Sequence, residues 1–300
     1  MRKYSVIVLL AVLLLASCSA QSKATKKVET RDYTLDSGKK VQVPKDPKRI
    51  VVVANTYAGG LKYLGGNIVG VTKDIEKSAV LKEKFKDTHK LNENDVEKVA
   101  KLKPDLIIVD STDKNIKKYN KIATTIPITY GKKDYLATQI KLGKILGKET
   151  EAKQWVNSWN KQTKKDAHEI KQHIGEDATV SIFDDFSKTI YAFGESWGRG
   201  GEVVYQAFDL NMPTALQKAV KKEGWKELSQ EKLPQYSGDY IITMSEGKAQ
   251  PEFEKTEMWK NIPAVKQGRV INVKAETYWF NDPYSLDYER KELKNKLLGK

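Results

Sequence analysis

The feature that most restricts the fold of this chain is a change of pattern near the middle of its 300 residues. From residue 133 to 175 the chain has strong helix formers and no proline, and residues 149–175 are predicted to form one long helix that ends at Gly175. On both sides, short runs rich in β-branched residues alternate with helical patterns, which is typical of α/β proteins. The chain is therefore predicted to fold as a lobe, a helix and a second lobe.

Predicted strands lie on each side of the long helix. They cover residues 49–54, 67–71, 105–109 and 126–129 before it, and residues 178–183, 190–193, 239–243 and 269–273 after it. The length of the chain also exceeds that of one ordinary domain, which agrees with two lobes.

A weak internal repeat relates the two predicted lobes. Glu97 lies eight positions before Asp105, which opens a predicted strand, and Glu231 lies eight positions before Asp239, which opens another. A repeated unit of this kind indicates two lobes of related build. A cleft between the lobes is then the natural place for a ligand.

The amino terminus has the pattern of a secretory signal. Two basic residues precede an apolar run from Val6 to Ala16, which is too short to span a bilayer. The run leads into Leu-Ala-Ser-Cys, which resembles the bacterial lipobox, and Cys18 is the only cysteine of the chain. We expect Cys18 to become the lipidated first residue of the mature protein; the alternative is a free thiol in an ordinary signal peptide.

The expected organisation of the chain follows from these patterns. It comprises a lipoprotein signal peptide (1–17), a lipidated tether (18–30), an N-terminal lobe (31–147), a spine helix (148–175) and a C-terminal lobe (176–300). The tether is expected because residues 19–30 are polar and lack apolar periodicity.

The chain is basic, with 53 Lys and Arg against 39 Asp and Glu and a formal net charge of +14. Because its lysines are spread along the whole sequence, residence at an anionic cell surface explains this charge better than nucleic-acid binding. A manganese or zinc site would need a cluster of histidines and carboxylates, and the chain has three histidines. Of these, His168 and His173 fall in a polar part of the predicted long helix, where we expect them to be solvated.

Several motifs together resemble one known family. They are the lipobox, Pro47 to Val51 at the first strand, the two repeated units in which a glutamate precedes a strand-opening aspartate by eight positions (the Glu-to-Asp elements), the single long helix and Val265 to Val270 near the end. Over nearly its whole mature length the chain thereby resembles the iron-siderophore substrate-binding lipoproteins of ABC importers. More narrowly, Thr56 to Gly60, Trp197 to Glu202 and Tyr278 to Pro283 are similar to motifs of the Gram-positive ferric hydroxamate-binding lipoproteins of the ferrichrome uptake system.

This resemblance implies an α/β fold of two Rossmann-like lobes with parallel central sheets, joined by a rigid spine helix, as in class III periplasmic binding proteins. It implies a monomer without enzymatic activity or cofactor, which captures an Fe(III)-hydroxamate siderophore of the ferrichrome or ferrioxamine type and delivers it to ABC permease subunits. The location it implies is the extracellular face of the cell membrane, through the lipid anchor. Because siderophore oxygens already surround the iron, the protein is expected to supply no metal ligand.

The surface of such a ligand favours arginine and aromatic side chains. Its hydroxamate oxygens accept hydrogen bonds, and its apolar linkers pack against rings. Only six basic residues are arginines, and Arg199 is one that lies between glycines, where a planar guanidinium could approach two oxygens. We assign Arg199 to the iron-bound oxygens and Trp197 to the organic shell; the alternative is an arginine in an exposed glycine-rich turn.

The remaining ligand candidates are aromatic, and core packing is the alternative for each of them. The resemblance places four on the C-terminal side of the cleft: Tyr191, Tyr278, Trp279 and Phe280. On the first lobe, Tyr57 and Tyr130 follow predicted strands, where α/β proteins usually bind ligands. Because Arg199 is the only basic residue in these motifs, neutral or mildly cationic hydroxamates are expected to fit better than a catecholate complex of about three negative charges.

Glu97 and Glu231 are candidates for contact with the transport machinery. The resemblance implies that such glutamates form salt bridges with arginines of the two permease subunits. A basic protein also needs local acidic patches to meet a basic partner. The alternative is a solvated residue at a helix start, favoured there by the helix dipole.

Features of the sequence are also compatible with two other functions. A haem-binding lipoprotein is the nearer one, since tyrosine, histidine or methionine could be axial ligands in an aromatic cleft. A secreted hydrolase could use Ser181 or Ser196 with Asp184 or His173, but the chain has no G-x-S-x-G and no H-E-x-x-H motif.

Overall fold

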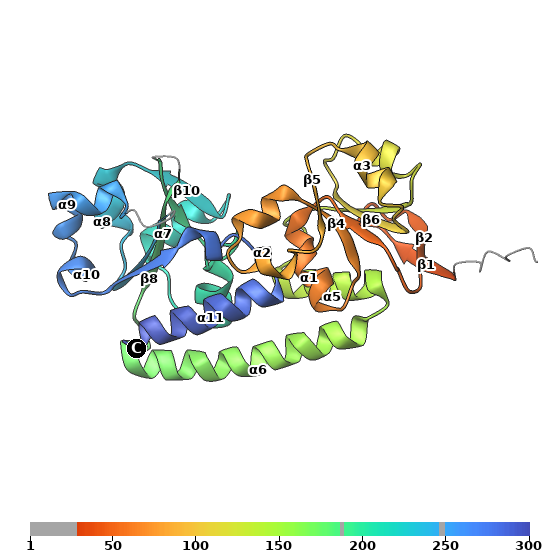
Figure 1. Cartoon of the computed structure of the whole chain (residues 1–300). Helices are drawn as coiled ribbons and strands as arrows, with labels where there is room; N and C mark the ends of the chain where they lie inside the picture. Colours follow the sequence, from red (N-terminus) through yellow and green to blue (C-terminus); the bar gives the residue numbers. More distant parts are fainter. Residues whose placement is uncertain (1–28, 187–188, 246–249) are drawn as a thin grey trace, which may run out of the picture.

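The computed structural model describes residues 29–186, 189–245 and 250–300. Within these ranges the chain forms two five-stranded sheets and a separate two-stranded hairpin. Figure 1 shows the two sheets side by side, with one long helix running beneath both. The expected signal peptide and Cys18 lie outside the described residues. No helix in the described ranges combines the length and the hydropathy that a membrane crossing requires.

The first sheet is wholly parallel. Its strands are β3 (Ile50–Val52), β4 (Ile68–Thr72), β5 (His89–Leu91), β6 (Leu106–Asp110) and β7 (Thr124–Ile128), in the order β5-β4-β3-β6-β7. Around it lie α1 (Ala58–Tyr63), α2 (Leu81–Lys84), α3 (Val96–Lys101), α4 (Ile116–Tyr119), α5 (Tyr135–Leu146) and the short 3-10 helices η1 (Asn55–Tyr57) and η2 (Lys73–Lys77). The central strand β3 is completely buried, as expected for a parallel sheet covered on both faces.

The second sheet is mixed, which corrects the expectation of two parallel sheets. Its strands are β8 (Val180–Phe186), β9 (Thr189–Phe193), β10 (Trp225–Leu228), β11 (Tyr240–Ser245) and β12 (Val270–Lys274), in the order β10-β9-β8-β11-β12. Strands β8, β11 and β12 are parallel, whereas β9 is antiparallel to both β8 and β10. Only two residues separate β8 from β9, and a parallel crossover needs a dozen or more.

Short helices surround the second sheet. They are the π-helix η3 (Glu202–Ala207), α7 (Thr214–Val220), η4 (Gln230–Lys232), α8 (Leu233–Tyr236), η5 (Glu252–Lys255), α9 (Glu257–Lys260), α10 (Pro263–Lys266) and η6 (Ala275–Thr277). All eight strands predicted from the sequence are confirmed, but the prediction missed β5, β10 and the hairpin of β1 (Thr30–Thr34) and β2 (Lys40–Pro44). Two of the missed strands, β5 and β10, have only three and four residues, which is too short for a clear pattern.

The long helix is confirmed as α6 (Glu149–Ile174), with Gly175 as its C-cap at φ 104°. At 1.5 Å per residue it is about 39 Å long, enough to pass beneath both sheets (Figure 1). The C-terminal helix α11 (Pro283–Leu297) runs along it, and the fully buried Asp166 of α6 accepts hydrogen bonds from Arg290 and Lys294 of α11. This ion-pair cluster fixes one helix on the other.

The internal repeat has a structural basis in the two aspartates. The carboxylate of Asp105, just before β6, accepts the backbone N–H groups of Lys48 and Arg49 at 2.6 and 3.0 Å, next to the start of β3. Asp239, just before β11, accepts the backbone N–H of Thr179 at 2.9 Å, next to the start of β8. In each sheet, therefore, an aspartate ties the beginnings of two neighbouring strands together.

The chain passes a second time between the sheets in residues 278–282, which we call the crossover segment. Tyr278 is fully buried in a hydrophobic cluster with β8, β11 and α11, whereas Phe280 belongs to the cluster around the first sheet. Asp282 lies so close to α1 that a Cβ atom on Gly59 would come within 2.3 Å of it. Glycine at position 59 thus permits the close approach of the crossover segment to the first lobe.

Candidate functional site

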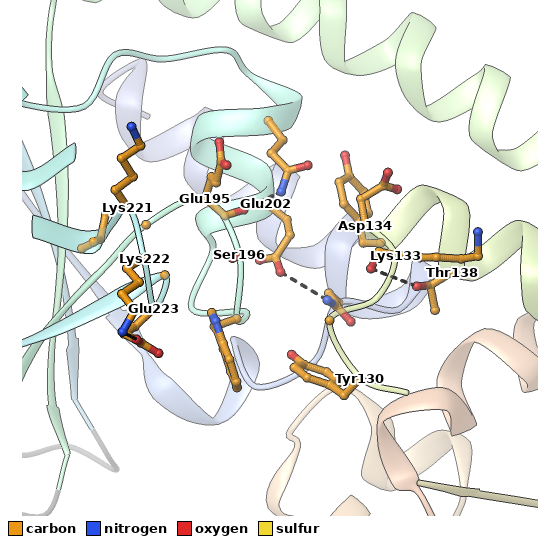
Figure 2. A pocket seen from close by; sticks show the side chains of 18 of the residues that line it. Tyr130, Lys133, Asp134, Thr138, Glu195, Ser196, Glu202, Lys221, Lys222 and Glu223 are labelled. Carbon is orange, nitrogen blue, oxygen red and sulfur yellow. Dashed lines mark hydrogen bonds and ion pairs between the residues drawn. The ribbon is translucent and has the colours of Figure 1, made fainter. Parts of the chain in front are cut away.

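A cavity of about 960 Å³ lies between the two lobes. The first lobe lines it with residues 56–57, after β3, with residues 129–131, after β7, and with the start of α5. The second lobe contributes residues 194–197, Glu202, residues 217–218 and residues 220–224, with Asn281 from the crossover segment. Figure 2 shows side chains from both lobes facing this space. The cavity lies at the carboxyl ends of β3 and β7, where α/β folds usually bind ligands.

Three of the ligand candidates meet in this cavity. Tyr57 and Tyr130 reach it from the first lobe and Trp197 from the second, and the rings of Tyr130 and Trp197 lie 5.3 Å apart. Trp197 is 49% exposed and Tyr130 is 38% exposed, so both rings are available to a ligand. Burial raises the pKa of Tyr130 to about 12, with a further contribution from Glu202, and burial likewise raises the pKa of Tyr57. Both phenols are therefore protonated at neutral pH and can donate hydrogen bonds.

Trp197 belongs to a turn of unusual backbone geometry. The φ angles of residues 197–200 are 84°, 74°, 59° and 79°, so four successive residues, Trp197, Gly198, Arg199 and Gly200, are left-handed. This conformation costs about 1–2 kcal/mol for a residue with a side chain, and two of the four are not glycine. Such strain persists only where the surrounding structure holds it, and it is most common at functional sites.

Arg199 lies beside the cavity and not in its lining. Its Nε atom donates to Asp184 on β8 at 2.6 Å, and its guanidinium carbon lies 4.5 Å from the ring centre of Trp279 and 5.7 Å from that of Phe193. The Asp184 side chain is 1% exposed and that of Arg199 is 12% exposed. The arginine is thus held by a buried ion pair between aromatic faces, which fixes the direction of its guanidinium group.

The other aromatic candidates divide into two groups. Tyr191 on β9 packs against the rings of Phe193 and Trp225, and Trp279 packs against Phe186, so these two belong to the aromatic surface around Arg199. Tyr278 and Phe280, by contrast, lie in the two hydrophobic cores, with exposures of 0% and 8%. The hydroxyl of Tyr278 donates to Glu292 on α11. In this structure the crossover segment buries one of them in each lobe, as in the core-packing alternative, and ligand contact by these two side chains stays a prediction.

Charged residues line the cavity in greater number than the sequence motifs indicated. Lysines 133, 218, 221 and 222 line it together with four acidic residues, Asp134, Glu195, Glu202 and Glu223. Arg199 is the only basic residue in the motifs that carry ligand candidates, but lysines from elsewhere in the fold also reach the cleft. Most of these lysines come from α7 and the segment after it, which carries no recognisable motif. The equal numbers of the two signs still favour a ligand of small net charge.

Glu202 is the buried acid among them, and sequence reasoning assigned it no role. Its side chain is 3% exposed, and its Oε1 atom accepts hydrogen bonds from the backbone N–H of Gly198 at 3.1 Å and from Nδ2 of Asn281 at 3.2 Å. Burial raises the pKa of Glu202, although these hydrogen bonds act in the opposite direction. An acid placed directly after a glycine-rich turn was the signal available in the sequence.

Glu97 and Glu231 lie far from the cavity on the two lobes. Both are exposed and stand in the first turn of a short helix, Glu97 in α3 and Glu231 in η4. A hydrogen bond from Ser229 lowers the pKa of Glu231, which keeps it ionised. In Figure 1, α3 and α8, which follows η4 directly, lie on the side of the molecule opposite α6.

Metal and hydrolase chemistry find little support in the site. In the described ranges, no group of three or more His, Cys, Asp and Glu side chains could hold a metal ion. The hydroxyl of Ser181 is buried and donates to the carbonyl of Tyr236 at 2.7 Å, while Asp184 pairs with Arg199. The pairing of Ser181 with Asp184 as a nucleophile and its partner is therefore not formed.

Known proteins resemble this chain over most of its length. The family described as "Periplasmic binding protein" matches residues 50–277. The Iron(3+)-hydroxamate-binding protein FhuD of Bacillus subtilis (strain 168) is 37% identical over 292 residues, which cover 93% of this chain and 92% of the relative.

Solved structures agree with this assignment. The FhuD protein from S. pseudintermedius is 53% identical, covers 91% of this chain and 99% of its own, and superposes with a TM-score of 0.85. FhuD2 from Staphylococcus aureus with bound ferrioxamine B is 56% identical, covers 84% of this chain and 99% of its own, and gives a TM-score of 0.82. With two sheets, one long helix and a cleft between the lobes, the chain belongs to the periplasmic binding protein family, in which its relatives bind substrates of ABC transporters and are not enzymes.

Proposed function

We propose that this protein captures ferric hydroxamate siderophores of the ferrioxamine or ferrichrome type in the cleft between its lobes. One observation carries the proposal: Tyr130 and Trp197, one from each lobe, lie with their rings 5.3 Å apart in the lining of a cavity of about 960 Å³, beside an arginine that a buried carboxylate orients. The bound ferrioxamine B of a structure 56% identical to this chain supports the ligand class.

The chemistry of the cleft suits a metal complex whose ligand oxygens face outwards. Protonated Tyr57 and Tyr130 offer O–H donors, and Arg199 offers N–H donors, to hydroxamate oxygens. Trp197, Trp279 and Tyr191 offer ring faces to the linkers of the siderophore. The iron keeps the oxygens of the siderophore, and the protein recognises the outside of the complex.

Titration of the protein with ferrioxamine B, ferrichrome and a ferric catecholate, followed by tryptophan fluorescence, tests the proposal. We expect saturable quenching by the two hydroxamates and weaker binding of the catecholate. A preference for the catecholate would contradict the hydroxamate assignment. Addition of haem serves as the control for the alternative function, because a bound haem gives an intense Soret band and a ferric hydroxamate does not.

The way the protein reaches its transporter is part of the same proposal. Residues 1–17 act as a signal peptide and residues 18–30 as a tether lipidated at Cys18, which holds a monomer on the extracellular face of the membrane. The lobes then comprise residues 31–147 and 176–300, with the spine helix 148–175 between them. Glu97 and Glu231, exposed on separate lobes, contact one permease subunit each. Labelling of the protein by radioactive palmitate in cells, and its loss in Cys18→Ala, tests the anchor.

A further inference from the structure

One buried carboxyl group contacts both the left-handed turn at residues 197–200 and the crossover segment. Oε1 of Glu202 accepts the N–H of Gly198, within the turn, and Nδ2 of Asn281, within the crossover segment. The dashed line at Glu202 in Figure 2 marks the second of these bonds. Glu202 is also the first residue of η3, directly after the turn, so its own backbone is fixed by the helix that follows.

The turn and the crossover segment form one unit in which Glu202 is a shared acceptor. The backbone N–H of Arg199 donates to the carbonyl of Tyr278 at 2.9 Å, and a Cβ atom on Gly198 would lie 3.3 Å from the same carbonyl oxygen. Gly198 is itself buried, so its N–H cannot turn to bulk solvent for a partner. Without the carboxyl group, this donor would be left unsatisfied inside the protein.

We propose that Glu202 is a positioning residue of the binding cleft, which holds the Trp197 to Gly200 turn in its left-handed conformation and ties it to the crossover segment. In this role Glu202 acts on the ligand through Trp197 and Arg199. The inference rests on the proposed function, because the ligand that these two residues would meet is the hydroxamate siderophore. It goes further by naming the group that keeps them in place.

The chain offers a matched control for the loss of a buried carboxyl group. Glu289 on α11 is 1% exposed, and its Oε1 atom has no hydrogen-bond partner among the described residues. It therefore shares the burial and the chemistry of Glu202 and interacts electrostatically with Glu202 and Arg199, but it does not make the hydrogen bond to the turn. Glu289→Gln removes a buried acid without removing the acceptor for Gly198.

Binding of ferrioxamine B to the full folded protein, followed by tryptophan fluorescence, provides the first test. Glu202→Ala is expected to weaken binding by at least about tenfold, since two hydrogen bonds to one acceptor are lost. Glu202→Gln keeps an acceptor oxygen and should weaken binding by no more than about threefold, and Glu289→Gln should bind like the wild type. If Glu202→Ala does not fold, Asn281→Ala removes the link to the crossover segment alone and should weaken binding by about threefold to fivefold.

Amide hydrogen exchange of the ligand-free protein provides a second, independent test. The Gly198 amide should be protected in the wild type and in Glu202→Gln, and should exchange at least about tenfold faster in Glu202→Ala. Val99→Ala, a core variant on α3 in a separate hydrophobic cluster of the first lobe, should lower thermal stability and leave both Gly198 exchange and affinity unchanged.

The outcomes separate this inference from the proposed function. If the wild type binds no hydroxamate, the proposed function fails, while Gly198 exchange still reports whether Glu202 holds the turn. If the wild type binds but Glu202→Ala binds equally well, or if Val99→Ala or Glu289→Gln loses as much affinity, the positioning role is wrong. Equal losses in Glu202→Gln and Glu202→Ala would also overturn it, because the acceptor atom would then not matter.

Discussion

The two lobes place their ligand candidates by different means. In the first lobe, Tyr57 and Tyr130 follow the ends of parallel strands β3 and β7, so the regular sheet alone brings them to the cleft. In the second lobe, Trp197 and Arg199 stand in a left-handed turn held by Glu202, Asp184 and the crossover segment. The first lobe thus relies on topology and the second on specific side-chain contacts, so the second should be more sensitive to single substitutions.

The largest expected effect concerns docking to the permease, to which both lobes should contribute equally. The double variant Glu97→Lys with Glu231→Lys should abolish siderophore uptake by cells, because both permease contacts become repulsive. Ligand affinity of the purified protein should not change, since both side chains are exposed and far from the cavity. The effect is measured as uptake of labelled ferric siderophore by cells. The single variants Glu97→Lys and Glu231→Lys compare the contributions of the two lobes to uptake. Undiminished uptake by the double variant would exclude the docking role.

The second prediction tests the dependence of the second lobe on a buried contact. Arg199→Ala removes an ion-pair partner of a carboxylate that is 1% exposed, and loss of one member of a buried pair costs about 3–5 kcal/mol of folding free energy. Hydroxamate affinity should fall by at least about tenfold as well. Chemical denaturation and fluorescence titration measure the two effects.

A double variant separates these two contributions. Arg199→Ala with Asp184→Asn should recover part of the stability, because the buried charge is gone, and none of the affinity. Recovery of affinity together with stability would show that Arg199 has no direct role at the ligand.

The third prediction compares one ring from each lobe. Trp197→Ala should weaken hydroxamate binding by about tenfold, because a large stacking surface is lost. Tyr130→Phe keeps its ring and loses one hydrogen bond of about 1 kcal/mol, so it should weaken binding by about fivefold. Both variants should keep the stability of the wild type within about 1 kcal/mol, since the two side chains are partly exposed. A larger loss of affinity in Tyr130→Phe than in Trp197→Ala would contradict the expectation that the second lobe is more sensitive to single substitutions.

The smallest expected effect is a pH dependence in the first lobe. The pKa of Tyr130 is raised from 10.0 to about 12 in the folded protein, so its neutral form favours folding below pH 10 and this contribution is lost as the pH rises towards 12. Tyr33, Tyr119 and Tyr135 behave similarly. Denaturation curves between pH 9 and 12 should therefore show a slightly smaller loss of stability for Tyr130→Phe than for the wild type. An identical loss would mean that Tyr130 is not protected from ionisation.

Much of the fold was predictable because its signals are local. Strand patterns, the long proline-free helix and the two Glu-to-Asp elements each depend on residues close in sequence. The antiparallel direction of β9 was not predicted, because strand direction depends on the length of a connection. The sequence pattern ended the preceding strand at residue 183, whereas β8 continues to Phe186, so the pattern made the connection look longer than it is. Local patterns thus identified the elements, whereas their direction required the structure.

The site was predictable only in part. Motif residues Tyr57, Tyr130 and Trp197 do line the cavity, whereas Tyr278 and Phe280 enter the cores of different lobes. Strand alternation would put residues two positions apart on the same side, but the crossover segment is irregular and not a strand. Lysines 218, 221 and 222 and the acceptor role of Glu202 depend on contacts between segments remote in sequence. No spacing rule reports such contacts.

The place of Phe280 has a consequence for how the protein assembles after export. Its side chain completes the core of the first lobe, although 279 residues precede it in the chain. A newly translocated N-terminal half therefore lacks part of its own interior until nearly the whole polypeptide has emerged. The two lobes should consequently unfold together in one thermal transition, and a truncation before residue 280 should expose the first lobe to proteases as well as the second.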